Sequence, residues 1–189
     1  MQQNFRRNKA KLFIISGADN SGKDEIVSAV RYLAKNKANV VKKYTTRNQK
    51  LDDEDELICK YIIKDKQANE NELKHVLNEA FDLSACDVSY KRKGNTYGIN
   101  TKDIWEGFQR GMFQFISVSD EETINKLIKI FGDLCVLVFC YSIERSSDFE
   151  LAFNTYVNNI DKYDHVFIFE EKQEDLYDQC FRLMNYYEK

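Results

Sequence analysis

The segment GADNSGKD, at residues 17–24, has residue types and spacing suited to binding phosphate. Gly17, Gly22 and Lys23 follow the pattern G-x-x-x-x-G-K, in which glycines permit a tight path and backbone amides converge on phosphate oxygens with the lysine ammonium. The expected phosphate-binding residues are therefore Gly17, Ala18, Asp19, Asn20, Ser21, Gly22, Lys23 and Asp24. A glycine-rich turn with a chance lysine is the alternative, and the flanking elements described below disfavour it.

Asp24 stands where such loops usually carry Ser or Thr, whose hydroxyl ligates Mg²⁺. A carboxylate can ligate Mg²⁺ directly or through water, so Asp24 is a candidate metal ligand. It also adds negative charge close to any bound phosphates. The alternative is an acid in the first turn of a helix, where it interacts favourably with the helix dipole.

The sequence on either side of the loop predicts a strand before it and a helix after it. Leu12 to Ser16 is an apolar run typical of a strand buried on both faces, and the apolar spacing over 26–34 predicts a helix. Strand patterns recur at 39–44, 113–118, 134–140 and 165–169, and helical stripes at 104–108, 124–131, 149–160 and 176–187. This alternation predicts an α/β fold with a parallel sheet and helices on both faces.

Two finer expectations follow from the same patterns. The 134–140 strand is the most hydrophobic, so we expect it at the centre of the sheet. Ser119 and Glu122 have capping-box spacing at the start of the next helix.

The region 45–98 breaks the alternation and predicts a small inserted lobe. Its features are an apolar run at 57–63, a helical stripe at 73–80 and a turn signal at Gly94-Asn95. We therefore expect a single domain over 1–189, with a core at 11–44 and 99–187.

Composition narrows the classes of function. The 189 residues carry a formal net charge of −3, which argues against nonspecific nucleic-acid binding. No apolar run approaches a membrane span, and nothing resembles a signal peptide. The five cysteines are odd in number and form no C-x-x-C pair, so neither a disulfide framework nor a zinc site is indicated. We expect a cytoplasmic protein without membrane or nucleic-acid partners.

The ordered set GADNSGKD, YTTR (44–47), GNTYG (94–98) and YDHVFIFEEKQEDLYDQC (163–180) resembles the guanylate kinase family. The resemblance covers about Lys11 to Tyr187. It implies a P-loop three-layer fold, use of ATP and Mg²⁺, and transfer of the γ-phosphate to a small phosphorylated acceptor such as GMP. Asp24 and Tyr44 are similar instead to the ribose 1,5-bisphosphate phosphokinase branch, which implies a different acceptor.

The resemblance also implies roles for single residues. Lys23 would contact the β- and γ-phosphates of ATP, and Arg47, with Thr46 beside it, would hold the acceptor phosphate. Tyr97 matches a tyrosine that contacts the same phosphate, and Lys50 replaces a second arginine as a point charge. The alternatives are a surface arginine, a loop lysine and an aromatic packed in a turn.

Three departures from the family pattern affect the expected chemistry. Only Asp87 could replace the glutamate that reads a guanine base, and Ser117 and Ser119 stand at acidic positions. The lid, at about 142–155, is short and offers only Arg145 to stabilise the transferring phosphoryl group. A catalytically degenerate module that binds a nucleotide or a protein is therefore a further alternative.

Overall fold

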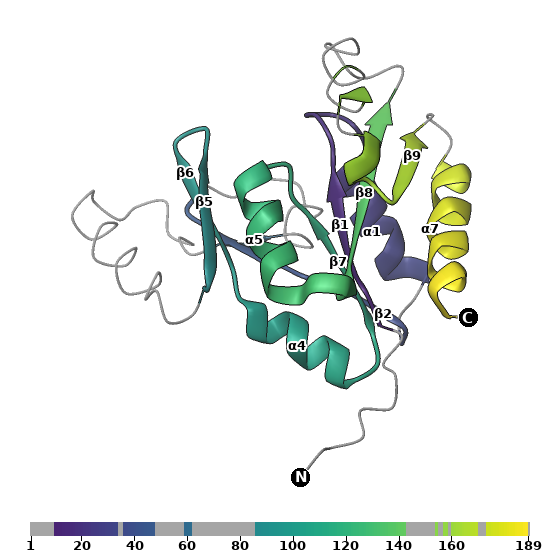
Figure 1. The fold of residues 1–189 in the computed structure, drawn as a ribbon, viewed down its shortest axis with the longest axis horizontal. Helices are drawn as coiled ribbons and strands as arrows, with labels where there is room; N and C mark the ends of the chain where they lie inside the picture. Colours follow the sequence, from purple (N-terminus) through teal and green to yellow (C-terminus); the bar gives the residue numbers. More distant parts are fainter. Residues whose placement is uncertain are drawn as a thin grey trace, which may run out of the picture.

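The structure is a computed structural model that describes residues 10–33, 36–47, 59–61, 86–142, 154, 157–158, 160–169 and 173–188. They form two sheets with helices packed around the larger one (Figure 1). The helical stripe at 73–80, and 143–153 of the expected lid, lie outside the described residues.

The larger sheet has, within the described residues, five parallel strands in the order β2-β7-β1-β8-β9. The strands are β1 (Leu12–Ser16), β2 (Ala38–Val40), β7 (Phe113–Ser117), β8 (Cys135–Ser142) and β9 (His165–Phe169). The predicted parallel α/β fold is therefore confirmed. The prediction for the most hydrophobic strand is wrong, because β1 lies at the centre and β8 lies between β1 and β9.

Side chains of β1 alternate between two hydrophobic cores, which explains why the whole strand is apolar. Phe13 and Ile15 face α1 (Lys23–Leu33) and α7 (Gln173–Glu188), while Leu12 and Ile14 face α4 (Thr101–Gln109) and α5 (Glu121–Phe131). Figure 1 shows these helix pairs on opposite faces of the sheet. The result is a three-layer arrangement with β1 in the middle.

The start of α5 differs from its predicted cap. Asp120 is the N-cap, and its carboxylate accepts a hydrogen bond from the Thr123 backbone N–H at 2.8 Å. The Ser119 hydroxyl instead donates to the Gly17 carbonyl at 2.7 Å. The capping box of Ser119 and Glu122 is therefore wrong, because Ser119 is oriented toward the glycine loop.

The predicted strand at 39–44 is divided between two sheets. Its first part is β2, and the backbone N–H of Val41 still donates to Phe115 at 2.8 Å. Beyond Lys42 the chain enters a second sheet as β3 (Lys43–Thr45). That sheet has the order β4-β3-β6-β5, with β4 (Cys59–Tyr61), β5 (Val88–Arg92) and β6 (Asn95–Ile99).

The predicted turn at Gly94-Asn95 is present one residue earlier, as a two-residue hairpin loop between β5 and β6. Lys93 and Gly94 have φ of 48° and 78°, as a type I′ turn requires.

The short 3₁₀ helices η1 (Gly132–Leu134) and η2 (Ile160–Lys162) complete the elements in the described residues. None of the described helices combines the length and apolar character needed to cross a membrane.

Replacing Phe13 tests the role of β1. Phe13 is fully buried and its ring stacks on Phe115 with centroids 4.5 Å apart. We expect Phe13→Ala to lower the free energy of unfolding by about 3 to 5 kcal/mol in urea denaturation, through lost burial and a cavity. Phe181→Ala, at a side chain on α7 that is 54% exposed, is the control, with a change within about 0.5 kcal/mol. Equal losses in the two variants would contradict a core centred on β1.

Candidate functional site

The loop between β1 and α1 is shaped by close contact with β8. A Cβ atom at Gly17 would lie 2.2 Å from the Cys140 carbonyl oxygen, so only glycine fits there. Asn20 and Gly22 have φ of 61° and 86°, a left-handed backbone that Asn and Gly tolerate best. These conformations wind the loop into the compact path that the glycine spacing predicts.

Lys23 begins α1 and folds back over the loop. Its Nζ donates to the Ala18 carbonyl at 2.6 Å, and the residue is 6% exposed. Burial lowers the pKa of Lys23, and the charge of Asp24 opposes that effect. The nearby charge of Arg92 lowers this pKa as well. An anion bound beside Lys23 would stabilise its charged form.

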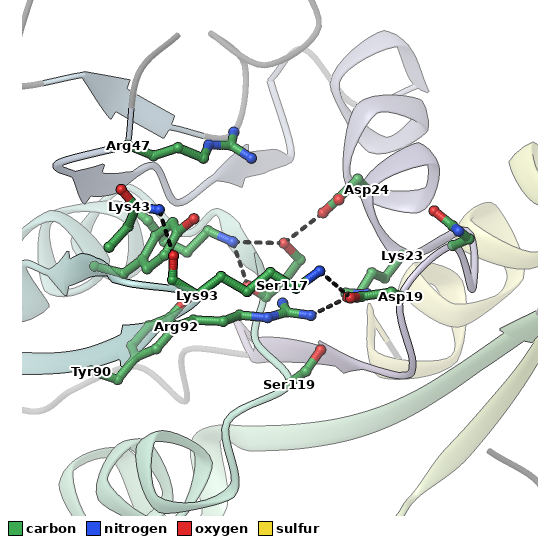
Figure 2. A pocket seen from close by; sticks show the side chains of 13 residues that line it. Asp19, Lys23, Asp24, Lys43, Arg47, Tyr90, Arg92, Lys93, Ser117 and Ser119 are labelled. Atoms are coloured by element: carbon green, nitrogen blue, oxygen red, sulfur yellow. Dashed lines mark hydrogen bonds and ion pairs between the residues drawn. The ribbon is translucent and has the colours of Figure 1, made fainter. Parts of the chain in front are cut away.

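A chain of hydrogen bonds joins three elements beside the loop. Lys43 of β3 is buried, and its Nζ donates to the Ser117 carbonyl at 2.8 Å and to the Ser117 hydroxyl at 3.0 Å. The Ser117 hydroxyl in turn donates to Asp24 at 2.9 Å. Ser117, at the end of β7, therefore links the second sheet to α1 (Figure 2).

A second link runs from the β5–β6 hairpin to the loop. The Asp19 carboxylate forms ion pairs with Arg92 and with Lys93, the latter at 3.0 Å (Figure 2). The hydrogen bond from Lys93 lowers the pKa of Asp19, and the Arg92 charge adds to this against an opposing effect of burial. The hairpin thus brings two cations to the glycine loop.

Between these links lies a cavity of about 470 Å³. Its described lining comes from the loop and α1, from the second sheet, and from the end of β7. The lining residues are Asp19, Asn20, Lys23, Asp24, Lys43, Arg47, Tyr90, Arg92, Lys93, Asn95, Tyr97, Ser117 and Ser119. Five of them are basic and two are carboxylates, so the cavity favours an anionic ligand.

The cavity brings together part of the predicted site. Asp19, Asn20, Lys23 and Asp24 line it from the loop side, and Arg47 and Tyr97 line it from the other side. The Tyr97 ring stacks on Tyr90 with centroids 5.1 Å apart. The remaining loop residues shape the backbone, and they are Gly17, Ala18, Ser21 and Gly22.

Other predicted residues lie elsewhere. The Thr46 hydroxyl accepts a hydrogen bond from the Thr96 backbone at 3.0 Å. Asp87 accepts from the Thr101 backbone N–H at 3.2 Å and from the Thr101 hydroxyl, at the start of α4. Neither residue is among those lining the cavity. Lys50 and Arg145 lie outside the described residues.

Sequence reasoning missed several cavity residues. No role was predicted for Lys43, Tyr90, Arg92, Lys93 or Asn95 at such a site. Ser117 was noted only as a departure from the family pattern, and Ser119 as a departure and as a capping residue. One usable signal was the basic run KRK directly before the Gly94-Asn95 turn, which places cations at a hairpin tip. Lys43 carries no comparable signal, because a lysine within a strand usually faces solvent.

The residues present are compatible with Mg²⁺ held jointly with phosphates. Within the described chain, no group of three or more His, Cys, Asp or Glu side chains could hold a metal by itself. Mg²⁺ is commonly bound through one or two carboxylates plus substrate phosphates. Asp24 and the neighbouring Ser117 hydroxyl supply oxygens suited to such a shared site.

Comparison with known proteins bears on the fold. No protein-family model matches this sequence, and no curated protein matches it. Among solved structures, the crystal structure of guanylate kinase from Anaplasma phagocytophilum is similar, with a TM-score of 0.60 and 16% identity. The match covers 94% of this chain and 85% of that chain. The chain therefore has a guanylate kinase-like fold, as expected.

Gly17 provides a test of the loop geometry. We expect Gly17→Ala to destabilise the protein more than Gly111→Ala, because only the first new methyl group would collide with backbone. Gly111 has φ of 72° and open space around it, so its loss should be about 1 to 2 kcal/mol from the backbone conformation alone. Urea denaturation measures both, and similar losses would contradict close packing of the loop on β8.

Proposed function

We propose that this protein is a phosphotransferase that binds ATP at the glycine loop and moves its γ-phosphate to a small phosphorylated acceptor such as GMP. The observation that supports this is the shared cavity, where loop residues face basic and hydroxyl side chains of the second sheet. The P-loop kinase fold supports the same proposal. In this proposal, residues 45–98 form the acceptor-binding lobe, which is inserted between the core segments 11–44 and 99–187.

Charge is the physical reason for this assignment. Donor and acceptor phosphates are both anions, so they repel as they approach, and cations between them lower that cost. Lys23 and Arg47 both line the cavity. In this proposal Lys23 binds the β- and γ-phosphates of ATP, and Arg47 binds the acceptor phosphate. The Tyr97 hydroxyl can donate a hydrogen bond to that same phosphate.

Magnesium would be held by Asp24 and the Ser117 hydroxyl together with the phosphates of ATP. When bound, it would neutralise part of the negative charge on the phosphates. The chain's own part is to orient Asp24, which Ser117 does through the 2.9 Å hydrogen bond. Lys43 fixes the Ser117 hydroxyl in turn.

Ribose 1,5-bisphosphate is a second candidate acceptor. Asp87, the only carboxylate expected to read a base, is bonded to Thr101 at the start of α4. Within the described residues, the second-sheet side of the cavity carries Lys43, Arg47, Arg92 and Lys93 and no carboxylate. Such a wall favours an acceptor rich in phosphate over one recognised through a base.

An ADP-release assay with ATP, Mg²⁺ and either GMP, other nucleoside monophosphates or ribose 1,5-bisphosphate tests the proposal. We expect turnover with at least one acceptor and a loss of kcat/KM of about 100-fold or more in Lys23→Ala, which removes a charge from the transferring phosphates. Lys129→Ala, at an exposed position on α5, is the control and should retain wild-type turnover.

Absence of turnover by folded protein with every acceptor would contradict a phosphotransferase. A thermal shift with ATP or GMP that persists in wild type and disappears in Lys23→Ala would then indicate a nucleotide-binding module. No shift with either nucleotide would favour a protein-binding role.

Arg47 tests the position of the acceptor. We expect Arg47→Ala to raise the KM for the acceptor about 10- to 100-fold, as loss of a charge-assisted phosphate contact predicts, and to change the KM for ATP less. Arg47→Lys should recover only part of the affinity, because an ammonium lacks the bidentate fork of a guanidinium. Steady-state kinetics with each substrate varied measures this. A larger effect on ATP than on the acceptor would contradict the assignment.

A further inference from the structure

The β5–β6 hairpin places Arg92 against the phosphate loop, although no motif in the sequence assigns it a role. Arg92 is the last residue of β5, and its guanidinium is ion-paired with Asp19, which lies 73 positions earlier in the chain. Both side chains line the cavity that also holds Lys23 (Figure 2). The guanidinium therefore lies within the region where the loop would hold phosphates.

Two like charges converge at this point. Lys23 and Arg92 line the same cavity, and the charge of Arg92 lowers the pKa of the Lys23 ammonium. Such a pair is unfavourable unless anions lie close to both, and Asp19 and Asp24 supply part of that negative charge. A bound phosphate between the cations would supply the rest.

Asp19 has two cationic partners, and this allows Arg92 to change its partner. Lys93 holds the second carboxylate oxygen at 3.0 Å, so Asp19 stays paired when Arg92 turns toward another anion. The Arg92 side chain is 38% exposed and the Lys93 side chain 77% exposed, so Arg92 is the more enclosed of the two cations. A guanidinium also offers five N–H donors, which suit several phosphate oxygens at once.

We propose that Arg92 is a catalytic residue whose guanidinium binds the oxygens of the phosphoryl group during its transfer. This rests on the proposed function. The lid segment expected at 142–155 contains a single arginine, Arg145, so a cation supplied by the β5–β6 hairpin would replace charge that this segment does not provide. Stabilisation by an arginine of this kind is worth about 10³- to 10⁵-fold in kcat in phosphoryl-transfer enzymes.

The reaction step balances without any further reactant. An oxygen of the acceptor phosphate forms a bond to the γ-phosphorus of ATP, and the bond from that phosphorus to the oxygen bridging the β-phosphate breaks. The electron pair of the broken bond stays on the departing ADP. An ionised acceptor phosphate has no proton to lose, so no base is needed, and negative charge on the transferring group is what Arg92 stabilises.

The test compares Arg92→Ala, Arg92→Lys and Lys91→Ala in the full-length protein with the acceptor that wild type uses. Lys91 is the neighbouring residue on β5, exposed and outside the cavity lining, so Lys91→Ala should match wild type. We expect Arg92→Ala to lower kcat by about 100-fold or more, with less than about a threefold change in the KM for ATP. Arg92→Lys should recover only part of kcat.

Two further measurements separate catalysis from folding. Guanidinium ion added to Arg92→Ala should restore part of kcat in a saturable manner and leave Lys91→Ala unchanged. ADP with aluminium fluoride, which mimics the transferring phosphoryl group, should bind wild type more tightly than Arg92→Ala in the presence of acceptor, while ADP alone binds both equally.

Wild-type kcat in Arg92→Ala would overturn the role of Arg92 and leave the proposed function standing. A reduced kcat that guanidinium does not restore, with equal aluminium fluoride binding, would also overturn it, since Arg92 would then only hold the hairpin. Inactivity of wild type with every acceptor would contradict the proposed function itself. It would also contradict the catalytic role of Arg92, because that role depends on the reaction.

Discussion

The buried ammonium of Lys43 limits how the two sheets can be arranged. A charge removed from water must be hydrogen-bonded and balanced, and here Ser117 supplies two acceptors while Asp24 supplies the nearby negative charge. Lys43 belongs to β3, Ser117 to β7 and Asp24 to α1, so the need to hydrogen-bond this ammonium keeps the second sheet beside the carboxyl end of β7. The glycine loop follows the carboxyl end of β1 and lies on the same side of the core sheet.

The cavity and its charge follow from that placement. The cations of the cavity come from both parts of the molecule: the second sheet and its connections supply Lys43, Arg47 and Arg92, and the core supplies Lys23. The cavity is therefore cationic on both walls only when the second sheet packs against the core in this position. The ion pair of Arg92 with Asp19 is a second connection across the same space. An anionic ligand in this cavity would therefore be in reach of cations on both walls.

Much of the fold was predictable because its signals are local. The apolar run of β1, the glycine loop and the helix after it occupy consecutive residues, and their pattern reflects burial on both faces of a parallel strand. The division of 39–44 between two sheets was not predictable, because it depends on where Val41 stops pairing with Phe115. The cap of α5 was mistaken for a similar reason, since Ser119 is held by Gly17, a residue far away in the sequence.

The sequence by itself determined the glycine loop between a strand and a helix, the alternation of core strands with helices, and the turn that follows the KRK run. Each of these depends on residue types at short spacing, where backbone conformation and periodicity decide the outcome. Only the tertiary structure decided which side chains face the cavity: it placed Lys43, Arg92 and Lys93 there and bonded Asp87 to Thr101 instead. The reason is that contacts such as Lys43 to Ser117, 74 residues apart, depend on how two sheets pack, and local sequence does not encode that packing.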